Sequence, residues 1–446
     1  MRSARNFVRP TFPSQRQRGQ ALIYGLFFIV TGLAALFFLF NTGQLSSEKT
    51  KLVNTADAVA YSAGVMHARA LNFDAYTNRA LMANEVMIAQ MVSLSSWVQY
   101  AEGHVQAVPA MACYTQYSVP VGLALIEYIP LCYALSYVVG EVAVQAARQV
   151  VDVVAPVVVA ASELAKVNLQ LAQVTMFATF LPARANLMQQ VADANYLNDG
   201  VVRVDTIPLT DNFVSFEGQP FIQRYSGDDR TRFREAELTA AHRDQFVRDR
   251  SWSSRSAWGC IPFIPSGRAE RTGSTDLVGF DEWRAEDQAA LQIQIYRIRL
   301  FGRSGCRTTA SYDLGSATQS SDDWSYSGVP NFFDLSDRAL AYTSGNPDPE
   351  KRDPRLKFAI RLVRSKTEAR TSAGTSAIKP TGRLAVFDGA EAGNVMAAVG
   401  TSEVYFARPP RADGREESAS LFNPYWQVRL TENSVADLAL ARGLQR

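Results

Sequence analysis

The chain has 446 residues, and 45 lysines and arginines nearly balance 43 aspartates and glutamates, for a formal net charge of +2. This balance argues against nucleic acid as the main partner. A hydrophobic content of 47% is typical of a folded chain and excludes general disorder. The length is enough for two or three domains.

The first forty residues carry the strongest signal. Residues 21–40 form a twenty-residue run without charge, which is long enough for one helix to cross a bilayer. Arginines precede this run, and they are expected to keep the N-terminus cytoplasmic while the chain after Phe40 is exported. These arginines are Arg2, Arg5, Arg9, Arg16 and Arg18.

A cleaved secretory signal is the alternative interpretation of this segment. Such a signal has an apolar core of roughly 7–15 residues and ends at a small-residue cleavage site. Here the run is longer, and Asn41-Thr42-Gly43-Gln44-Leu45 follows it. The sequence therefore favours a retained anchor, with residues 1–20 as a basic cytoplasmic leader and residues 21–40 as the transmembrane helix.

An apolar stripe with helical spacing follows the anchor. Its members recur at steps of three and four residues, as on one helix face, and the stripe breaks around residues 74–79 before it resumes. This pattern predicts one long helix or two in series, packed either within the chain or against another subunit. The predicted packing face contains Leu52, Ala56, Val59, Ala63, Met66, Ala70, Met87, Met91 and Leu94.

Residues 105–160 are also strongly apolar. Pro109, Pro120 and Pro130 interrupt them, and only thirteen uncharged residues separate Glu127 from Glu141, too few to cross a bilayer. A buried or membrane-surface helical hairpin is the expectation, and a second span is the alternative. Helical spacing resumes over residues 141–198, where Pro156 is expected to kink or divide the helix. The exported helical region is accordingly assigned to residues 41–198.

From residue 199 onward short strands are expected. Residues 356–363 and 426–430 alternate in the period-two pattern of a strand with one buried face. Further strands are expected at 201–204, 213–216, 291–300 (with a bulge near Tyr296), 384–387 and 403–407, and one helix at about 230–249. Loops are expected at 303–329, 344–354, 366–380 and 409–419. The predicted fold class is α+β: a single transmembrane helix continues into a helical region, and a β-rich domain covers residues 199–446.

The four cysteines are Cys113, Cys132, Cys260 and Cys306. An even number outside the cytoplasm favours disulfides. Three pairings are possible, of which the local pairs Cys113–Cys132 and Cys260–Cys306 are the simplest, and four buried free thiols are the alternative. No C-x-x-C pair occurs, so a zinc site is not expected.

Motifs for common catalytic chemistry are absent. No phosphate-binding glycine loop, no H-E-x-x-H and no G-x-S-x-G occurs, and no catalytic residue, cofactor or metal is expected. His67 and His104 are interpreted as ordinary core or surface residues. One literal match is Asp323-Trp324-Ser325-Tyr326-Ser327, which fits the D-x-S-x-S metal motif of von Willebrand A-type domains, but the polar residues before it do not form the usual hydrophobic strand.

The N-terminal region resembles the TadE/TadG-like proteins of bacterial Tad (Flp) pilus assembly. The resemblance rests on the basic leader, on residues 18–22 (RGQAL) and on residues 52–60 (LVNTADAVA). Residues 78–85 (NRALMANE) and 423–426 (NPYW) are similar to a subgroup without a clear von Willebrand domain. Prepilins and TadE-type pseudopilins are cut after a glycine and carry glutamate five residues later. If Gly19 were that glycine, Tyr24 would stand at the position.

The resemblance implies a structural, non-enzymatic component of Tad/Flp pilus assembly or a related secretion machine, with Tyr24 favouring a retained TadG-like leader. It would sit in the bacterial inner membrane by one span, with its bulk in the periplasm. Its partners would be the bilayer and other assembly or secretion proteins. Self-association stays open, from the alternative in which the packing face meets another subunit. Two other classes stay open: an exported ligand-binding adhesin or sensor with an aromatic site built from Trp252, Trp258, Trp283 or Trp324, and a membrane-anchored envelope enzyme that uses paired carboxylates.

Overall fold

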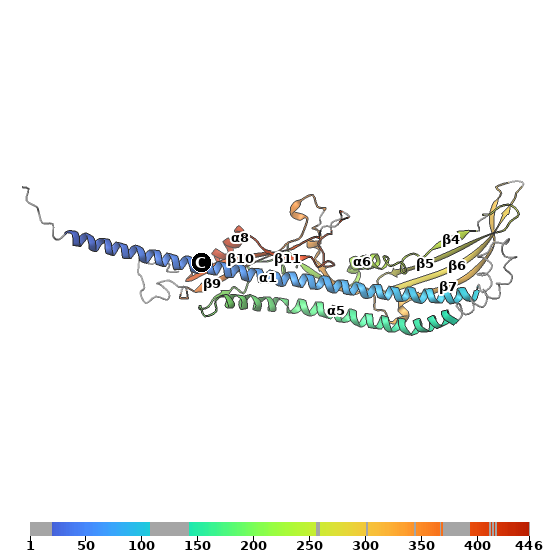
Figure 1. Ribbon diagram of the computed structural model, residues 1–446, viewed down its shortest axis with the longest axis horizontal. Coiled ribbons are helices and arrows are strands. Elements are labelled where there is room, and N and C mark those ends of the chain that lie inside the picture. Colours follow the sequence, from blue (N-terminus) through green and yellow to red (C-terminus); the bar gives the residue numbers. More distant parts are fainter. Residues whose placement is uncertain are drawn as a thin grey trace, which may run out of the picture.

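The computed structural model describes residues 20–107, 142–255, 259–299, 302–342, 345–365, 367–368, 393–409, 412, 414 and 417–445. The molecule is elongated along helix α1 (Gln20–Ala107), whose 88 residues extend about 130 Å at 1.5 Å per residue. Helix α5 (Val144–Asn195) runs back beside α1. Figure 1 shows α1 between α5 on one side and the β-sheets on the other, with the sheets following one another along its length.

Helix α1 is continuous, so the alternative of two helices in series is wrong. The stripe breaks at residues 74–79 because polar side chains there make contacts inside the molecule. Asp74 and Asn78 are fully buried. Asn78 Nδ2 donates hydrogen bonds to the carbonyl oxygens of Phe333 at 2.7 Å and Leu421 at 2.8 Å. A polar interruption of an apolar stripe therefore marks a tertiary contact here.

Helix α5 is also continuous and passes through Pro156 and Pro182. A proline removes one helical hydrogen bond, but α5 packs against α1 over its length and does not divide at Pro156. Near its start, Arg148 forms an ion pair with Glu102 of α1 at 3.0 Å. The expected hairpin or second span falls largely on residues 108–141, which lie outside the described residues.

The sheet closer to the apolar end of α1 has the strand order β1-β9-β10-β11, and β2 also pairs with β9. All of its pairings are antiparallel. Its strands are β1 (Arg203–Val204), β2 (Thr210–Asp211), β9 (Leu356–Ser365), β10 (Val395–Phe406) and β11 (Trp426–Leu430). Strand β9 was expected to bury one face, yet Ala359 and Arg361 on its other face are buried as well. Both faces are therefore covered.

The sheet at the far end of α1 has the order β4-β5-β6-β7. Its strands are β4 (Trp252–Arg255), β5 (Ser266–Val278), β6 (Glu282–Arg297) and β7 (Gly305–Ser320). Strand β7 overturns the prediction of a loop over 303–329: its Ser- and Thr-rich sequence looks like a loop, but it pairs along β6. The register shifts between Gln288 and Ala290 and between Ile293 and Gln294, so the irregularities precede the bulge expected near Tyr296.

Smaller elements connect the two sheets. Strands β3 and β8 pair with each other, and α6 occupies the first part of the helix expected at about 230–249. Residues 213–216 are a turn and an isolated bridge instead of the expected strand, while residues 384–387 lie outside the described part. These elements are β3 (Ile222–Tyr225), η3 (Gly227–Arg230), α6 (Thr231–Ala241), η4 (Ser321–Trp324), β8 (Phe332–Leu335), α7 (Asp337–Leu340), η5 (Pro349–Lys351) and α8 (Val435–Gly443).

Candidate functional site

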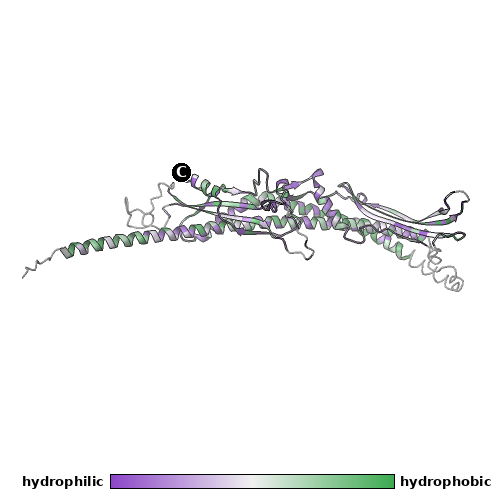
Figure 2. Ribbon diagram, turned by 90° about the horizontal axis from the view of Figure 1, so that it is seen from above, coloured by the Kyte–Doolittle hydropathy of each residue, from purple (hydrophilic) through white to green (hydrophobic). Residues whose placement is uncertain are grey.

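The first twenty residues of α1 form an exposed apolar segment. In the part of the chain that the structure describes, α1 is the one helix long and apolar enough to cross a membrane. Large side chains from Leu22 to Phe40 lie open to solvent, with Leu22 78% exposed and Leu39 71% exposed. Figure 2 shows this hydrophobic stretch projecting from the body of the molecule. The five arginines of the leader lie outside the described residues.

The predicted packing face of α1 lies mostly inside the chain. Five of its members are buried in the core between α1, α5 and the sheet of β9–β11. They are Leu52, Ala56, Val59, Ala63 and Ala70. Met66 packs at the edge of this core, and Met91 and Leu94 pack at the edges of cores further along α1. Met87 points outward, with 42% of its surface exposed.

The two sequence segments of the second resemblance, 78–85 and 423–426, lie against each other. Arg79 Nε donates to the carbonyl oxygen of Phe422 at 2.8 Å, and its guanidinium also donates to Asn423 Oδ1 at 2.6 Å. Two turns earlier, Asn72 donates to the carbonyl of Trp426 and accepts from the Trp426 backbone N–H. Side chains of α1 therefore fix the C-terminal loop and the start of β11.

A buried charge cluster joins α1 to α5 and α6. Glu85 accepts hydrogen bonds from Tyr326 Oη at 2.6 Å and Trp283 Nε1 at 3.2 Å, and Lys166 Nζ lies 2.5 Å from its other oxygen. Glu237 of α6 is also buried. Burial raises the pKa of Glu237 well above its ordinary value, and the charge of Glu85 raises it further. Burial raises the pKa of Glu85 too, but the Lys166 charge and the hydrogen bonds from Lys166, Tyr326 and Trp283 lower it. We therefore assign the negative charge opposite Lys166 to Glu85 and the proton to Glu237.

A second buried cluster surrounds His67 of α1. Its ring contacts three phenylalanines, and Arg184 of α5 donates to its Nε2 at 2.9 Å. Arg184 also forms an ion pair with Asp211 at 2.5 Å. Burial lowers the pKa of His67 well below its usual value, and the Arg184 charge lowers it further. His67 is therefore a neutral core residue.

The other histidine of α1, His104, is partly buried, and its Nδ1 lies 2.7 Å from the carbonyl oxygen of Leu314.

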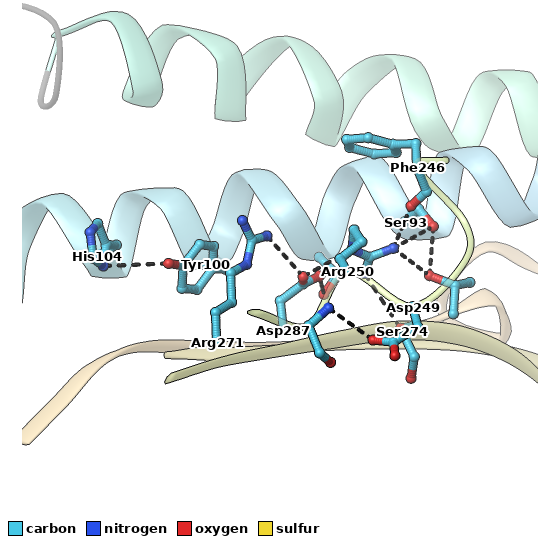
Figure 3. A network of polar contacts seen from close by, with 12 residues as sticks. Ser93, Tyr100, His104, Phe246, Asp249, Arg250, Arg271, Ser274 and Asp287 are labelled. Carbon is cyan, nitrogen blue, oxygen red and sulfur yellow. Dashed lines mark hydrogen bonds and ion pairs between the residues drawn. The ribbon is translucent and has the colours of Figure 1, made fainter. Parts of the chain in front are cut away.

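Where α1 meets the far sheet, an aspartate of β6 collects polar partners from several elements (Figure 3). Asp287 is 1% exposed. It forms ion pairs with Arg250 at 2.8 Å and Arg271 at 3.2 Å, and it accepts a hydrogen bond from Ser96 of α1. The Arg271 guanidinium also lies 4.5 Å from the ring centre of Tyr100. This network attaches the last turns of α1 to the sheet.

A polar cavity of about 400 Å³ lies beside this network, and its lining includes Asp249, Glu286 and Asp287. The Asp287 carboxylate is occupied by its two arginines, and the described lining contains no histidine, cysteine or lysine. Trp283, a candidate for an aromatic ligand site, is fully buried in the core beside Glu85, whereas Trp252 is half exposed on β4. The described lining of the cavity contains no tryptophan.

The cysteines that the structure describes form the expected pair. Cys260 and Cys306 are joined by a disulfide, with their Cα atoms 6.1 Å apart. The bond ties the segment before β5 to the start of β7. Cys113 and Cys132 lie outside the described residues, so their pairing stays a prediction.

The D-x-S-x-S segment is used for packing. Tyr326 binds Glu85, and Ser327 Oγ donates to Glu163 of α5. Asp323 accepts a hydrogen bond from Gln319 at 2.7 Å. Among the described residues no group of three or more His, Cys, Asp or Glu side chains is placed to hold a metal ion.

Sequence reasoning missed the roles of Glu85 and Lys166. The signal that could have revealed them is a lone lysine at an inward-facing position of a helix, which indicates a buried ion pair.

Comparison with known proteins gives one match. Residues 19–70 match the family described as "Putative Flp pilus-assembly TadE/G-like". No curated protein and no solved structure matches the chain. This match confirms the TadE/TadG-like resemblance for residues 19–70. The matched segment begins where the exposed apolar stretch of α1 begins, and it ends in the core beside the first sheet.

Proposed function

We propose that this chain, TadE/G-like in its N-terminal segment, is a membrane-anchored structural component of Tad/Flp-type pilus assembly or a related secretion machine. One observation carries the proposal: the matched residues 19–70 contain both the exposed apolar segment and the first buried turns of the same helix. Anchor and body are thus one rigid element. A long body on such an anchor suits contacts with other assembly proteins at a distance from the membrane.

The proposed location is the inner membrane, with the leader in the cytoplasm and the body in the periplasm. The leader arginines support this orientation because they resist export. The Cys260–Cys306 disulfide supports an oxidising compartment for the far sheet. Tyr24 supports a fixed component over a filament subunit, since an ordinary pilin would carry glutamate there if Gly19 were the cleavage site.

Deletion of the gene in the bacterium that carries it tests the proposed role. We expect loss or strong reduction of surface pili, scored by electron microscopy and by sheared pilin, and restoration by the full chain. The matched control is a chain in which residues 1–40 are replaced by a cleavable export signal. It should reach the periplasm and fail to restore pili. Normal piliation in the deletion strain would contradict the role, and rescue by the unanchored chain would contradict the need for an anchor.

A further inference from the structure

The side of α5 that faces away from α1 carries a continuous apolar stripe, here called the α5 stripe. Its members recur at alternating steps of three and four residues, and all of them are exposed. Leu164 is 65% exposed and Leu171 is 61% exposed. The α5 stripe consists of Val150, Val153, Val157, Ala160, Leu164, Val167, Leu171, Val174, Ala178 and Leu181.

The spacing of the α5 stripe is that of a coiled-coil seam. Alternating steps of three and four give a repeat of 3.5 residues, which keeps apolar positions on one line only if the helix winds around a partner. A seam sustained over three or four heptads favours a coiled coil. The α5 stripe runs from Val150 to Leu181, or about 48 Å at 1.5 Å per residue.

The same face lacks charge. Between Asp152 and Arg184, α5 has two charged residues, Glu163 and Lys166. Lys166 is 1% exposed and bonded to both Glu85 and Glu163. A helix face left in water normally carries charged residues, and an exposed apolar strip of this length marks an interaction site. An acidic or basic partner surface would find no complementary charge here, whereas a second uncharged face fits.

The position of α5 along α1 argues against lipid as the partner. The Arg148–Glu102 and Arg184–His67 contacts fix which levels of α1 the helix covers. Counted from Phe40 at 1.5 Å per residue, these levels lie about 40 to 90 Å beyond the apolar segment. With that segment in a bilayer, the α5 stripe stands clear of the membrane.

We propose that the α5 stripe binds the α5 stripe of a second copy of this chain, forming a parallel two-stranded coiled coil. Copies anchored in one membrane have the same orientation, and their stripes lie at the same height, so each residue meets its own counterpart. Val154, Asn168 and Thr175 on one flank of the seam are uncharged. On the other flank the charged residue is Glu163, which is paired with Lys166 of the same helix, so two identical faces do not repel each other strongly. The inference uses the membrane anchor of the proposed function and not its pilus role.

Cysteine cross-linking in membranes tests this dimer. The full chain is expressed with Leu164→Cys or Leu171→Cys, both on the seam, and oxidised mildly. We expect a reducible band at twice the 49.1 kDa mass of the chain. The matched control is Thr179→Cys, which is exposed on α5 but off the seam, and the unmodified chain gives the background of its own cysteines. Neither should form the band.

A charge variant keeps the test decisive if a cysteine disturbs the fold. Leu164→Lys combined with Leu171→Lys places like charges across the seam, and we expect at least a tenfold loss of dimer in detergent by sedimentation. Thr179→Lys should leave the dimer unchanged. Unchanged circular dichroism of the double variant shows that the monomer fold survives. Monomer at every position, equal cross-linking on and off the seam, or a cross-linked band of another mass would overturn the proposal. Loss of pili without loss of the dimer leaves it standing.

Discussion

Single polar side chains on α1 link segments that are far apart in the chain. Asn78 holds the backbone at Phe333 and Leu421, and Glu85 holds Lys166 and Tyr326. A buried polar group is costly unless it is satisfied, so each of these contacts specifies one arrangement of the helices and loops. This is why polar residues interrupt the apolar face of α1.

Lys166→Met is expected to destabilise the protein strongly, because it leaves Glu85 without its ion-pair partner in a buried site. Breaking a buried pair typically costs about 3–5 kcal/mol. Chemical unfolding of the detergent-solubilised chain measures the loss. Adding Glu85→Gln to the same variant should recover part of it. Lys357→Met, at an exposed position near the start of β9, should change stability by less than about 0.5 kcal/mol. An undiminished stability of Lys166→Met would refute the ion pair.

The raised pKa of Glu237 makes stability depend on pH. In the unfolded chain Glu237 loses its proton above about pH 4.5, whereas in the folded chain it keeps the proton up to its raised pKa. Between these two pH values the free energy of unfolding falls as the pH rises. The fall is up to about 1.4 kcal/mol per pH unit. Buried Asp74 and Asp334 also have raised pKa values and contribute a fall of the same sign. Glu237→Gln should therefore remove the Glu237 share of this fall and be more stable than the unmodified chain at pH 8.

Denaturant unfolding at pH 4 to 8 measures the effect. The control is Glu235→Gln, which changes an exposed residue of the same helix and should keep the pH dependence of the unmodified chain. Parallel pH profiles for Glu237→Gln and the unmodified chain would show that Glu237 is ionised in the fold.

At the scale of elements, α1 serves as the support on which the first sheet is built. Gly400 of β10 lies so close to α1 that a Cβ atom there would be 2.5 Å from the carbonyl carbon of Ala56 and 2.9 Å from the backbone nitrogen of Asp57. The helix backbone cannot move away without breaking the core around Leu52 and Val59. The sheet therefore packs directly on the helix that contains the anchor.

Gly400→Ala should cost about 1–3 kcal/mol, since the added methyl group forces α1 and β10 apart. Thermal unfolding followed by circular dichroism measures it. Gly43→Ala is the matched control, because a Cβ at Gly43 of α1 meets nothing within 4 Å, and alanine is expected to stabilise the helix by up to about 1 kcal/mol. If both substitutions behave alike, the close approach of helix and sheet is wrong.

Much of the element content could be predicted from local patterns. Strand β9 and strand β11 follow from their alternation, and the helices follow from the spacing of three and four. Strand β7 could not be predicted, because its serines and threonines pair with β6 and have little apolar pattern of their own. The buried site around Glu85 could not be predicted either, since its members come from α1, α5, α6 and two other segments.

At the scale of the whole molecule, the structure is a long two-helix rod with sheets along one side and an apolar end. Helix α1 joins the exposed apolar segment to the far sheet without a break, and the Asp287 network fixes its last turns. The helical region assigned to 41–198 and the β-rich region assigned to 199–446 share cores along this helix. We propose that they work as one body, which the anchor holds at a fixed orientation.

Thiol labelling in intact cells tests the anchored, exported rod most directly. A cysteine is placed at Ser311, which is exposed on β7, or at Ser3 in the basic leader, and the unmodified chain gives the background. The outer membrane is permeabilised, and the reagent cannot cross the inner membrane. It should label Ser311→Cys in intact cells and Ser3→Cys only after lysis. Both variants should be recovered in the membrane fraction. Labelling of Ser311→Cys only after lysis would contradict export of the body, and recovery of the chain in the soluble fraction would contradict the anchor.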